Sequence, residues 1–190
     1  MEFDLVIQGP LDNTSISKVD EISSQFENVI ISHWSENDSS LLGDIKSENV
    51  SVFNQPTPNR QDTTGVMKDS TFFYSISSTF LGLQHCTSNY TIKMRSDEYY
   101  EDFTSLKELF LENDNKFVFG NIFAKPWSHS MYHIGDHLFV AKTDLLLKGY
   151  AILYDLYTGK GSLFENPWAV HGYPKHQTAE SILALSFLKA

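Results

Sequence analysis

A charged cluster directly follows an apolar strand in the stretch YTIKMRSDEYY, residues 90–100. Apolar and polar residues alternate along its first half, with the period of two that is typical of a strand. Arg95, Asp97 and Glu98 then come at the carboxyl end of that strand, where an open α/β sheet builds its ligand crevice. Carboxylates beside a basic group at such a place suit a divalent cation and a phosphate-bearing ligand together.

The two neighbouring carboxylates are not equivalent. Consecutive residues on a strand point to opposite faces, so Asp97 and Glu98 cannot both bind one metal ion unless the strand has already turned. We expect Asp97 to be a direct ligand of Mn²⁺ or Mg²⁺, with Glu98 behind it or facing solvent. The alternative interpretation is a solvated acidic turn.

A second group of candidates follows the first and third predicted strands. Gln8, Gly9 and Pro10 lie where α/β proteins commonly hold a nucleotide. Gly9 permits a close backbone approach and Gln8 could bind a base, but taken alone the three residues favour a simple tight turn. No dinucleotide fingerprint or P-loop lysine motif accompanies them. Arg60 lies in the loop after the third strand and suits a bidentate contact with phosphate.

Two further carboxylates come later in the chain. Asp136 stands just before an apolar strand and could be a general base or a ligand of a sugar hydroxyl, or simply a turn residue. Glu180 opens the last helix, where a carboxylate often does no more than favour the helix dipole.

Three histidines, His129, His133 and His137, are spaced by four residues. On one helix this spacing would bring three imidazoles together as a zinc site. Pro126 before them and Gly135 among them argue against a continuous helix.

Strand and helix patterns alternate along the chain and must position these residues. Strands are expected over residues 3–8, 29–32, 50–53, 90–94, 117–122 and 137–140. Helices are expected over residues 15–26, 73–83, 106–111, 145–157 and 178–188. A strand, a helix and a strand within about thirty residues form a βαβ unit, which requires a parallel sheet. We therefore predict an α/β fold with a central, mostly parallel twisted sheet flanked by helices.

Composition limits the classes of protein. A chain of 190 residues that is 41% hydrophobic has enough apolar residues for one core, so we expect a single domain over 1–190; its abrupt end after an apolar helix suggests a domain cut from a longer polypeptide. The net charge of −10, without a run of Lys or Arg, argues against nucleic acid as a partner. One cysteine, no signal peptide and no apolar stretch of ~20 residues favour a cytoplasmic protein without a transmembrane segment.

Six short motifs carry a resemblance to a known family. They are, in chain order, LVIQGP, VIISHW, NRQ, KMRSD, GDHLFV and AESILALSFL. In these motifs the chain resembles the WavE-type glycosyltransferases of bacterial lipopolysaccharide synthesis and the related glycosyltransferase domains of large algal viruses, which act in chlorovirus capsid glycosylation. The motifs span nearly the whole chain, and KMRSD and GDH are the more specific of them.

The resemblance implies a GT-A-like fold with one nucleotide-sugar-binding domain. Such an enzyme transfers a hexosyl or deoxyhexosyl group from a nucleoside diphosphate donor, with UDP favoured, to a protein-linked or lipid-linked glycan acceptor. A viral member would work in the cytoplasm of its host.

The resemblance also assigns roles to the candidate residues. In this family a D-x-D-type motif holds Mn²⁺ or Mg²⁺ against the donor diphosphate. The corresponding residues here are Ser96, Asp97 and Glu98, which lack the first Asp, and Arg95 could supply part of the missing charge. The remaining roles are nucleoside contact by Gln8, Gly9 and Pro10, donor contact by Arg60, sugar or acceptor contact by Asp136, and a catalytic-side carboxyl at Glu180.

Several readings stay open at this point. An inverting enzyme needs a base for the acceptor hydroxyl, for which Asp136 is the first candidate and Glu180 the second, whereas in a retaining enzyme both would only position the sugar. A sugar nucleotidyltransferase would carry a basic, glycine-rich loop after the first strand, but this loop reads GPLDNTS. A non-catalytic glycan-binding module is usually all-β, and acidic charge disfavours a metal-dependent nuclease.

Overall fold

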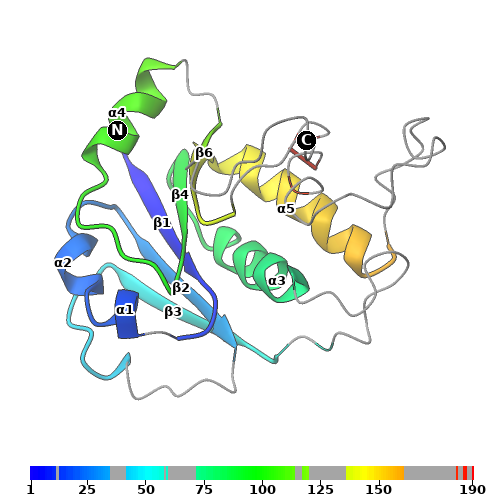
Figure 1. Ribbon diagram of the computed structural model, residues 1–190, viewed down its shortest axis with the longest axis horizontal. Helices are drawn as coiled ribbons and strands as arrows, with labels where there is room; N and C mark the ends of the chain where they lie inside the picture. Colours follow the sequence, from blue (N-terminus) through cyan, green and yellow to red (C-terminus); the bar gives the residue numbers. More distant parts are fainter. Residues whose placement is uncertain are drawn as a thin grey trace, which may run out of the picture.

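Six strands form one sheet in the order β3-β2-β1-β4-β6-β5 within the residues that the computed structural model describes (Figure 1). Those residues are 1–11, 13–34, 42–57, 59, 72–113, 117–119, 136–160, 183, 186–187 and 190. The strands are β1 (Phe3–Gln8), β2 (Val29–Trp34), β3 (Val50–Gln55), β4 (Tyr90–Arg95), β5 (Val118–Phe119) and β6 (Leu138–Lys142). The helices are α1 (Asn13–Ile16), α2 (Val19–Ser23), α3 (Phe72–Leu83), α4 (Thr104–Glu112) and α5 (Thr143–Tyr157).

β1 to β4 run in the same direction, and β6 alone of the six strands runs the opposite way. β1 pairs in parallel with β2 and β4, and β2 pairs in parallel with β3. β6 runs antiparallel to β4, and β5 runs antiparallel to β6. All residues of β1 are buried, which is the pattern of a central strand covered on both faces.

Helices cover both faces of the sheet (Figure 1). Side chains from alternate strand positions, such as Val6 and Phe139, pack with α3 and α5. Their neighbours on the opposite face, such as Leu5 and Met94, pack with α1, α2 and α4. The predicted α/β architecture with a mostly parallel sheet is confirmed, and β6 is its one reversed strand among the described residues.

The predicted helix over residues 15–26 is wrong in one respect, because the chain forms two short helices there. Between α1 and α2, the hydroxyl of Ser17 donates a hydrogen bond of 2.5 Å to the carbonyl of Asn13. The Ser17 amide donates to the same carbonyl at 3.4 Å, so the hydroxyl adds a second bond there, of a kind that often bends helices. A new turn begins with the bond from the Glu21 amide to the Lys18 carbonyl, 3.0 Å long.

The other predicted elements agree within the described residues. β2, β3 and β4 each extend one or two residues beyond the predicted ends. Of the predicted strand over 117–122 the structure describes the pair Val118–Phe119, and of the predicted last helix Leu183, Ser186 and Phe187, all helical. In the described parts of the chain, no helix combines the length and apolarity needed to cross a membrane.

The sheet brings three separate segments to one edge. Gln8, the last residue of β1, lies opposite Arg95, the last residue of β4. Because β6 is antiparallel, its beginning lies beside the same end of β4, where Leu138 pairs with Met94. Residues that precede β6 in sequence are therefore brought to the end of β4.

Candidate active site

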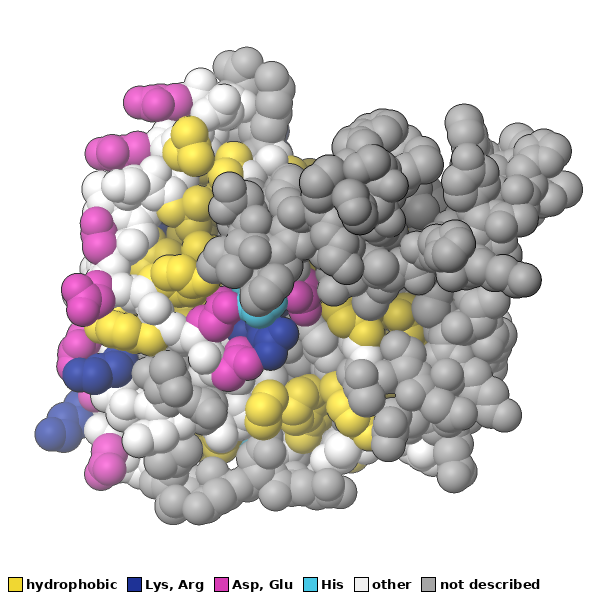
Figure 2. Space-filling view, in the orientation of Figure 1, with side chains coloured by type: hydrophobic (Ala, Val, Ile, Leu, Met, Phe, Trp, Pro, Cys, Tyr) yellow, Lys and Arg dark blue, Asp and Glu magenta, His cyan; other side chains and the backbone are white. Residues whose placement is uncertain are grey.

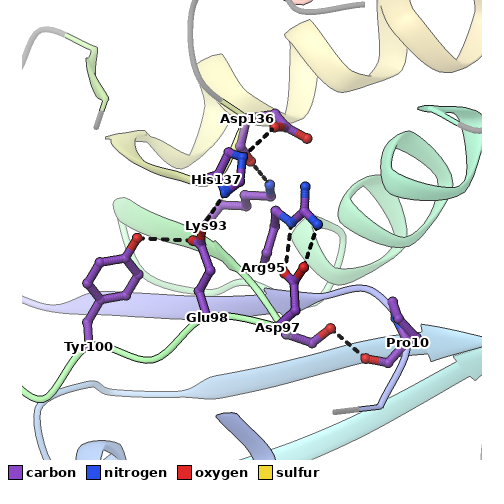
Figure 3. A network of polar contacts seen from close by, with 9 residues as sticks. Pro10, Lys93, Arg95, Asp97, Glu98, Tyr100, Asp136 and His137 are labelled. Atoms are coloured by element: carbon purple, nitrogen blue, oxygen red, sulfur yellow. Dashed lines mark hydrogen bonds and ion pairs between the residues drawn. The ribbon is translucent and has the colours of Figure 1, made fainter. Parts of the chain in front are cut away.

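The carboxyl end of β4 and the residues just before β6 form one cluster of charged side chains (Figure 3). Figure 2 shows acidic and basic side chains gathered around a histidine in the middle of one face. The cluster contains Lys93, Arg95, Asp97, Glu98, Asp136 and His137. Three of the predicted site residues, Arg95, Asp97 and Asp136, thus lie in one place.

Arg95 and Asp97 form a bidentate ion pair. The Arg95 Nε donates to Asp97 Oδ1 at 2.8 Å, and Nη2 donates to Oδ2 at 2.5 Å. The hydrogen bonds and charge of Arg95 lower the pKa of Asp97, and Asp97 in turn raises the pKa of Arg95. The side chains remain 34% and 47% exposed, so a ligand can reach both groups.

Glu98 and His137 form a second pair, next to the first. The His137 Nδ1 is hydrogen-bonded to Glu98 Oε1, and the hydroxyl of Tyr100 donates to Glu98 Oε2 at 3.0 Å. On its other side, His137 Nε2 lies 3.7 Å from Asp136 Oδ1. The imidazole therefore lies between two carboxylates, which come from separate segments of the chain.

Lys93 supports the cluster from inside the protein. Its side chain is fully buried, its Nζ donates to the main-chain carbonyl of Asp136, and the ammonium lies 5.2 Å from the centroid of the Phe139 ring. Burial lowers the pKa of Lys93 to about 8, although the charge of Asp136 acts in the opposite direction. Lys93 thus fixes the backbone that carries Asp136.

Ser96 has a structural role at the first position of the acidic motif. It is buried, its hydroxyl donates to the carbonyl of Pro10 at 2.5 Å, and its amide donates to the carbonyl of Gln8 at 2.9 Å. Gly9 between them has φ 127°, and a Cβ there would lie 2.6 Å from the Ser96 hydroxyl. These contacts hold the loop after β1 against the end of β4.

The side chain of Gln8 is buried on the face of the sheet that α3 covers. Its Oε1 accepts a hydrogen bond of 3.1 Å from the hydroxyl of Ser78 on α3. Contact of Gln8, Gly9 and Pro10 with a nucleoside stays a prediction. Arg60 and Glu180 lie outside the described residues, so their assigned roles stay predictions as well.

The sequence did not reveal the roles of Lys93, Ser96 and His137. Lys93 is one of the polar residues in the alternating pattern of its strand, and it is buried because the sheet is covered on both faces. The burial of both faces of a covered strand could have predicted that Lys93 is buried. For His137, the signal was its place directly after Asp136 in the GDH motif.

The fit of a divalent cation depends on Asp97. Among the described residues, no group of three or more His, Cys, Asp or Glu side chains could hold a metal ion. Mg²⁺ and Mn²⁺ commonly take one or two carboxylates and complete their coordination with substrate phosphates and water. The half-exposed carboxylate of Asp97 fits such a site, in which a bound diphosphate supplies the other ligands.

Comparison with known proteins supports the fold. No curated protein sequence matches the chain. Among solved structures, the chain is similar to S. aureus TarS 1-349, with 12% sequence identity and a TM-score of 0.52. The match covers 99% of the present chain and 56% of the TarS chain. The chain is also similar to the 4-diphosphocytidyl-2C-methyl-D-erythritolsynthase of Anaerococcus prevotii DSM 20548, with 12% sequence identity and a TM-score of 0.50. This match covers 100% of the present chain and 99% of the synthase chain. The GT-A-like fold class is thereby confirmed.

A family model describes the chain over nearly its whole length. The model for WavE lipopolysaccharide synthesis matches residues 3–185. Together with the fold, this match supports an enzyme of the glycosyltransferase or nucleotide-sugar class. The resemblance to WavE-type proteins is confirmed, whereas the resemblance to viral domains stays a prediction. The chain belongs to the WavE lipopolysaccharide synthesis family.

Proposed function

We propose that the chain is a metal-assisted glycosyltransferase that moves a sugar from a nucleoside diphosphate, with UDP favoured, to a glycan acceptor. The observation that carries this proposal is the meeting of the Arg95–Asp97 pair with Asp136 at the carboxyl ends of parallel strands in a GT-A-like sheet. At this edge of the sheet, the Arg95 guanidinium can bind a diphosphate, the Asp97 carboxylate can bind a metal ion, and the Asp136 carboxylate can act on an acceptor.

The donor diphosphate lies against the end of β4 in this proposal. Arg95 binds its oxygens with the planar fork of donors that suits phosphate. Asp97 would hold Mn²⁺ or Mg²⁺ beside these phosphates. The cation supplies stabilisation of the negative charge that develops on the leaving nucleoside diphosphate. Gln8, Gly9 and Pro10 contact the nucleoside, and Arg60 adds a further contact with the donor.

Asp136 acts on the acceptor side. Its carboxylate takes the proton from the acceptor hydroxyl while the hydroxyl oxygen forms a bond to the anomeric carbon of the sugar. The bond from that carbon to the diphosphate breaks, and the electron pair leaves with the nucleoside diphosphate. Glu180 is the second candidate for this base; in a retaining reaction both carboxylates position the sugar instead.

The family description favours one class of acceptor. Lipopolysaccharide synthesis extends glycans that are carried on a lipid, so we propose a lipid-linked glycan of bacterial type as the acceptor. Because nucleotide sugars are cytoplasmic metabolites, we also propose that the reaction takes place in the cytoplasm.

The experiment that tests the proposal measures nucleotide release. UDP-glucose, UDP-galactose, UDP-N-acetylglucosamine and GDP-mannose are incubated with the protein and Mn²⁺, and free UDP or GDP is measured with water or an oligosaccharide as acceptor. One donor should be consumed, and Asp136→Asn should lower kcat by roughly 100-fold with little change in KM for the donor.

The control is Asp144→Asn, which removes a carboxylate that is 70% exposed on α5 and should leave kcat unchanged. Release of neither nucleotide from any donor contradicts the proposed function. Equal losses of kcat and donor affinity in Asp136→Asn would make Asp136 a donor contact instead of the base.

A further inference from the structure

Ser96 connects the two places at which the donor is proposed to bind. It stands between Arg95 and Asp97 in the chain, and its side chain contacts the loop after β1 at Gly9. We propose that Ser96 is a positioning residue that holds this loop in place beside Asp97, so that the nucleoside and the diphosphate of one donor bind together. This inference rests on the proposed function and adds a residue to its donor side.

Neighbouring side chains at the end of β4 point in different directions. Arg95 and Asp97 are paired with each other through hydrogen bonds of 2.8 and 2.5 Å, and both remain partly exposed. Ser96, between them, is 3% exposed and points into the protein, as alternate residues of an extended chain do. Its hydroxyl is therefore placed to position other protein groups and not to bind the donor directly.

Two hydrogen bonds tie Ser96 to the loop. The hydroxyl donates to the carbonyl of Pro10 at 2.5 Å, drawn as a dashed line in Figure 3, and the amide donates to the carbonyl of Gln8 at 2.9 Å. The loop is also held by β2, because the amide of Gly9 donates to the carbonyl of Ser32 at 3.3 Å. The loop is thus fixed between β2 and the end of β4.

The residue types at positions 9 and 96 both suit this short contact. A Cβ on Gly9 would lie 2.6 Å from Oγ of Ser96, and the φ of Gly9 is 127°, which residues with side chains rarely adopt. A hydroxyl at position 96 can donate to the carbonyl of Pro10, whereas a carboxylate there would only accept and would repel that carbonyl. Gly9 thus lets the hydroxyl come close, and the hydroxyl supplies the bond.

A fixed loop matters for a ligand that has two binding groups. In the proposed function, a nucleoside diphosphate contacts the loop through its nucleoside and Asp97 through its cation. Its affinity is highest when both parts of the site are in place before it arrives. Without the Ser96 hydroxyl, the ligand itself has to order the loop, which lowers its affinity. Pyrophosphate contacts the phosphate part of the site alone, so its affinity does not depend on the loop.

The test compares Ser96→Ala with the control Ser23→Ala. The control removes another buried serine hydroxyl, which donates to the carbonyl of Asp20 at 3.1 Å on α2. Calorimetry with Mg²⁺ measures the Kd of UDP and of GDP for the wild type, and the nucleotide that binds more tightly is used for the variants. Competition with this nucleotide gives the Kd of pyrophosphate.

We expect Ser96→Ala to weaken nucleotide binding by about fivefold, as for the loss of one neutral hydrogen bond, with the Kd of pyrophosphate within about twofold of the wild type. Ser23→Ala should leave both Kd values unchanged, although it also removes a hydrogen bond. Equal losses for the nucleotide and pyrophosphate would show a general disturbance of the strand end and overturn the positioning role. An unchanged Kd for the nucleotide overturns it as well.

Should Ser96→Ala fail to fold, as judged by its thermal melt, Ser96→Cys decides. A thiol has a similar size but is a weak donor, so a selective loss of nucleotide affinity supports the positioning role and normal affinity overturns it. Pyrophosphate that does not compete with the nucleotide in the wild type overturns it too, because the diphosphate then lies elsewhere. Failure of the proposed function is different, since the wild type would then bind neither UDP nor GDP; that result overturns both.

Discussion

Lys93 is a fully buried ammonium group in β4, under α3 and α5. Burial disfavours the charged form and lowers the pKa of the group to about 8, from an ordinary 10.5. The hydrogen bond to the carbonyl of Asp136 and the ring of Phe139 keep the ammonium in place. Lys93 therefore lowers the free energy of unfolding at neutral pH while it positions the cluster.

Lys93→Met should change how stability depends on pH. Between pH 8 and 10.5 the unfolded chain keeps a proton at Lys93 that the folded protein has released, so the wild-type free energy of unfolding rises with pH. This rise amounts to at most about 3 kcal/mol. Lys93→Met lacks it, so the stability of the variant relative to the wild type should fall between pH 8 and 10.5. Urea unfolding at pH 7.5, 9 and 10 measures the difference, and parallel pH profiles would contradict the account.

Part of the candidate site could be predicted from the sequence. Arg95, Asp97 and Asp136 stand at strand ends, and strand ends are readable from the alternation of apolar and polar residues. The contacts of His137 with Glu98 could not be predicted, because they depend on the antiparallel pairing of β6 with β4. Pairing between strands more than forty residues apart leaves no local signal in either one. The roles of Arg60 and Glu180 stay predictions.

At the scale of elements, α3 lies close to the sheet at Gly82. A Cβ at this position would lie 2.7 Å from Val6 Cγ1 on β1 and 3.2 Å from the Cβ of Ser32 on β2. Ser32 also donates a hydrogen bond of 2.6 Å to the Ser78 carbonyl one turn earlier in α3. Glycine at this position therefore lets α3 lie close to β1 and β2.

Gly82→Ala should destabilise the fold. Alanine improves helix propensity by about 1 kcal/mol, but overpacking against Val6 costs 1–3 kcal/mol, so we expect a net loss of about 1 kcal/mol in the free energy of unfolding. Urea denaturation measures the loss. Gly43→Ala is the control, since Gly43 is exposed in a turn and its change should stay within about 0.5 kcal/mol. A stabilised Gly82→Ala variant would mean that α3 can move away from the sheet freely.

The order of elements was largely predictable, whereas two details were not. Buried strands alternating with amphipathic helices require parallel pairing, and β1 to β4 pair in this way. The reversal at β6 has no signature in its own residues, since LFVAK would suit either direction. The break between α1 and α2 falls at Ser17 and Lys18, where the helical spacing of the neighbouring apolar residues conceals it.

At the scale of the whole molecule, the cationic groups of the site contrast with the negative net charge of the chain. The net charge is −10, yet the proposed donor is itself an anion. Lys93 and Arg95 place two cationic groups at the end of β4, and the pairing of Arg95 with Asp97 keeps this charge balanced until a ligand arrives. In the proposed function, a cation held by Asp97 would add the remaining positive charge, and donor binding would then depend on the metal ion.

The most direct test of the central claim is a calorimetric titration of UDP and GDP into the protein, each with and without Mn²⁺. The account predicts that one nucleotide, with UDP favoured, binds with a Kd in the micromolar range when Mn²⁺ is present. This binding should weaken at least tenfold without Mn²⁺, and equally in Asp97→Asn. No binding of either nucleotide under any metal condition would contradict a nucleotide-sugar donor site, and binding indifferent to both Mn²⁺ and Asp97→Asn would contradict the metal assistance.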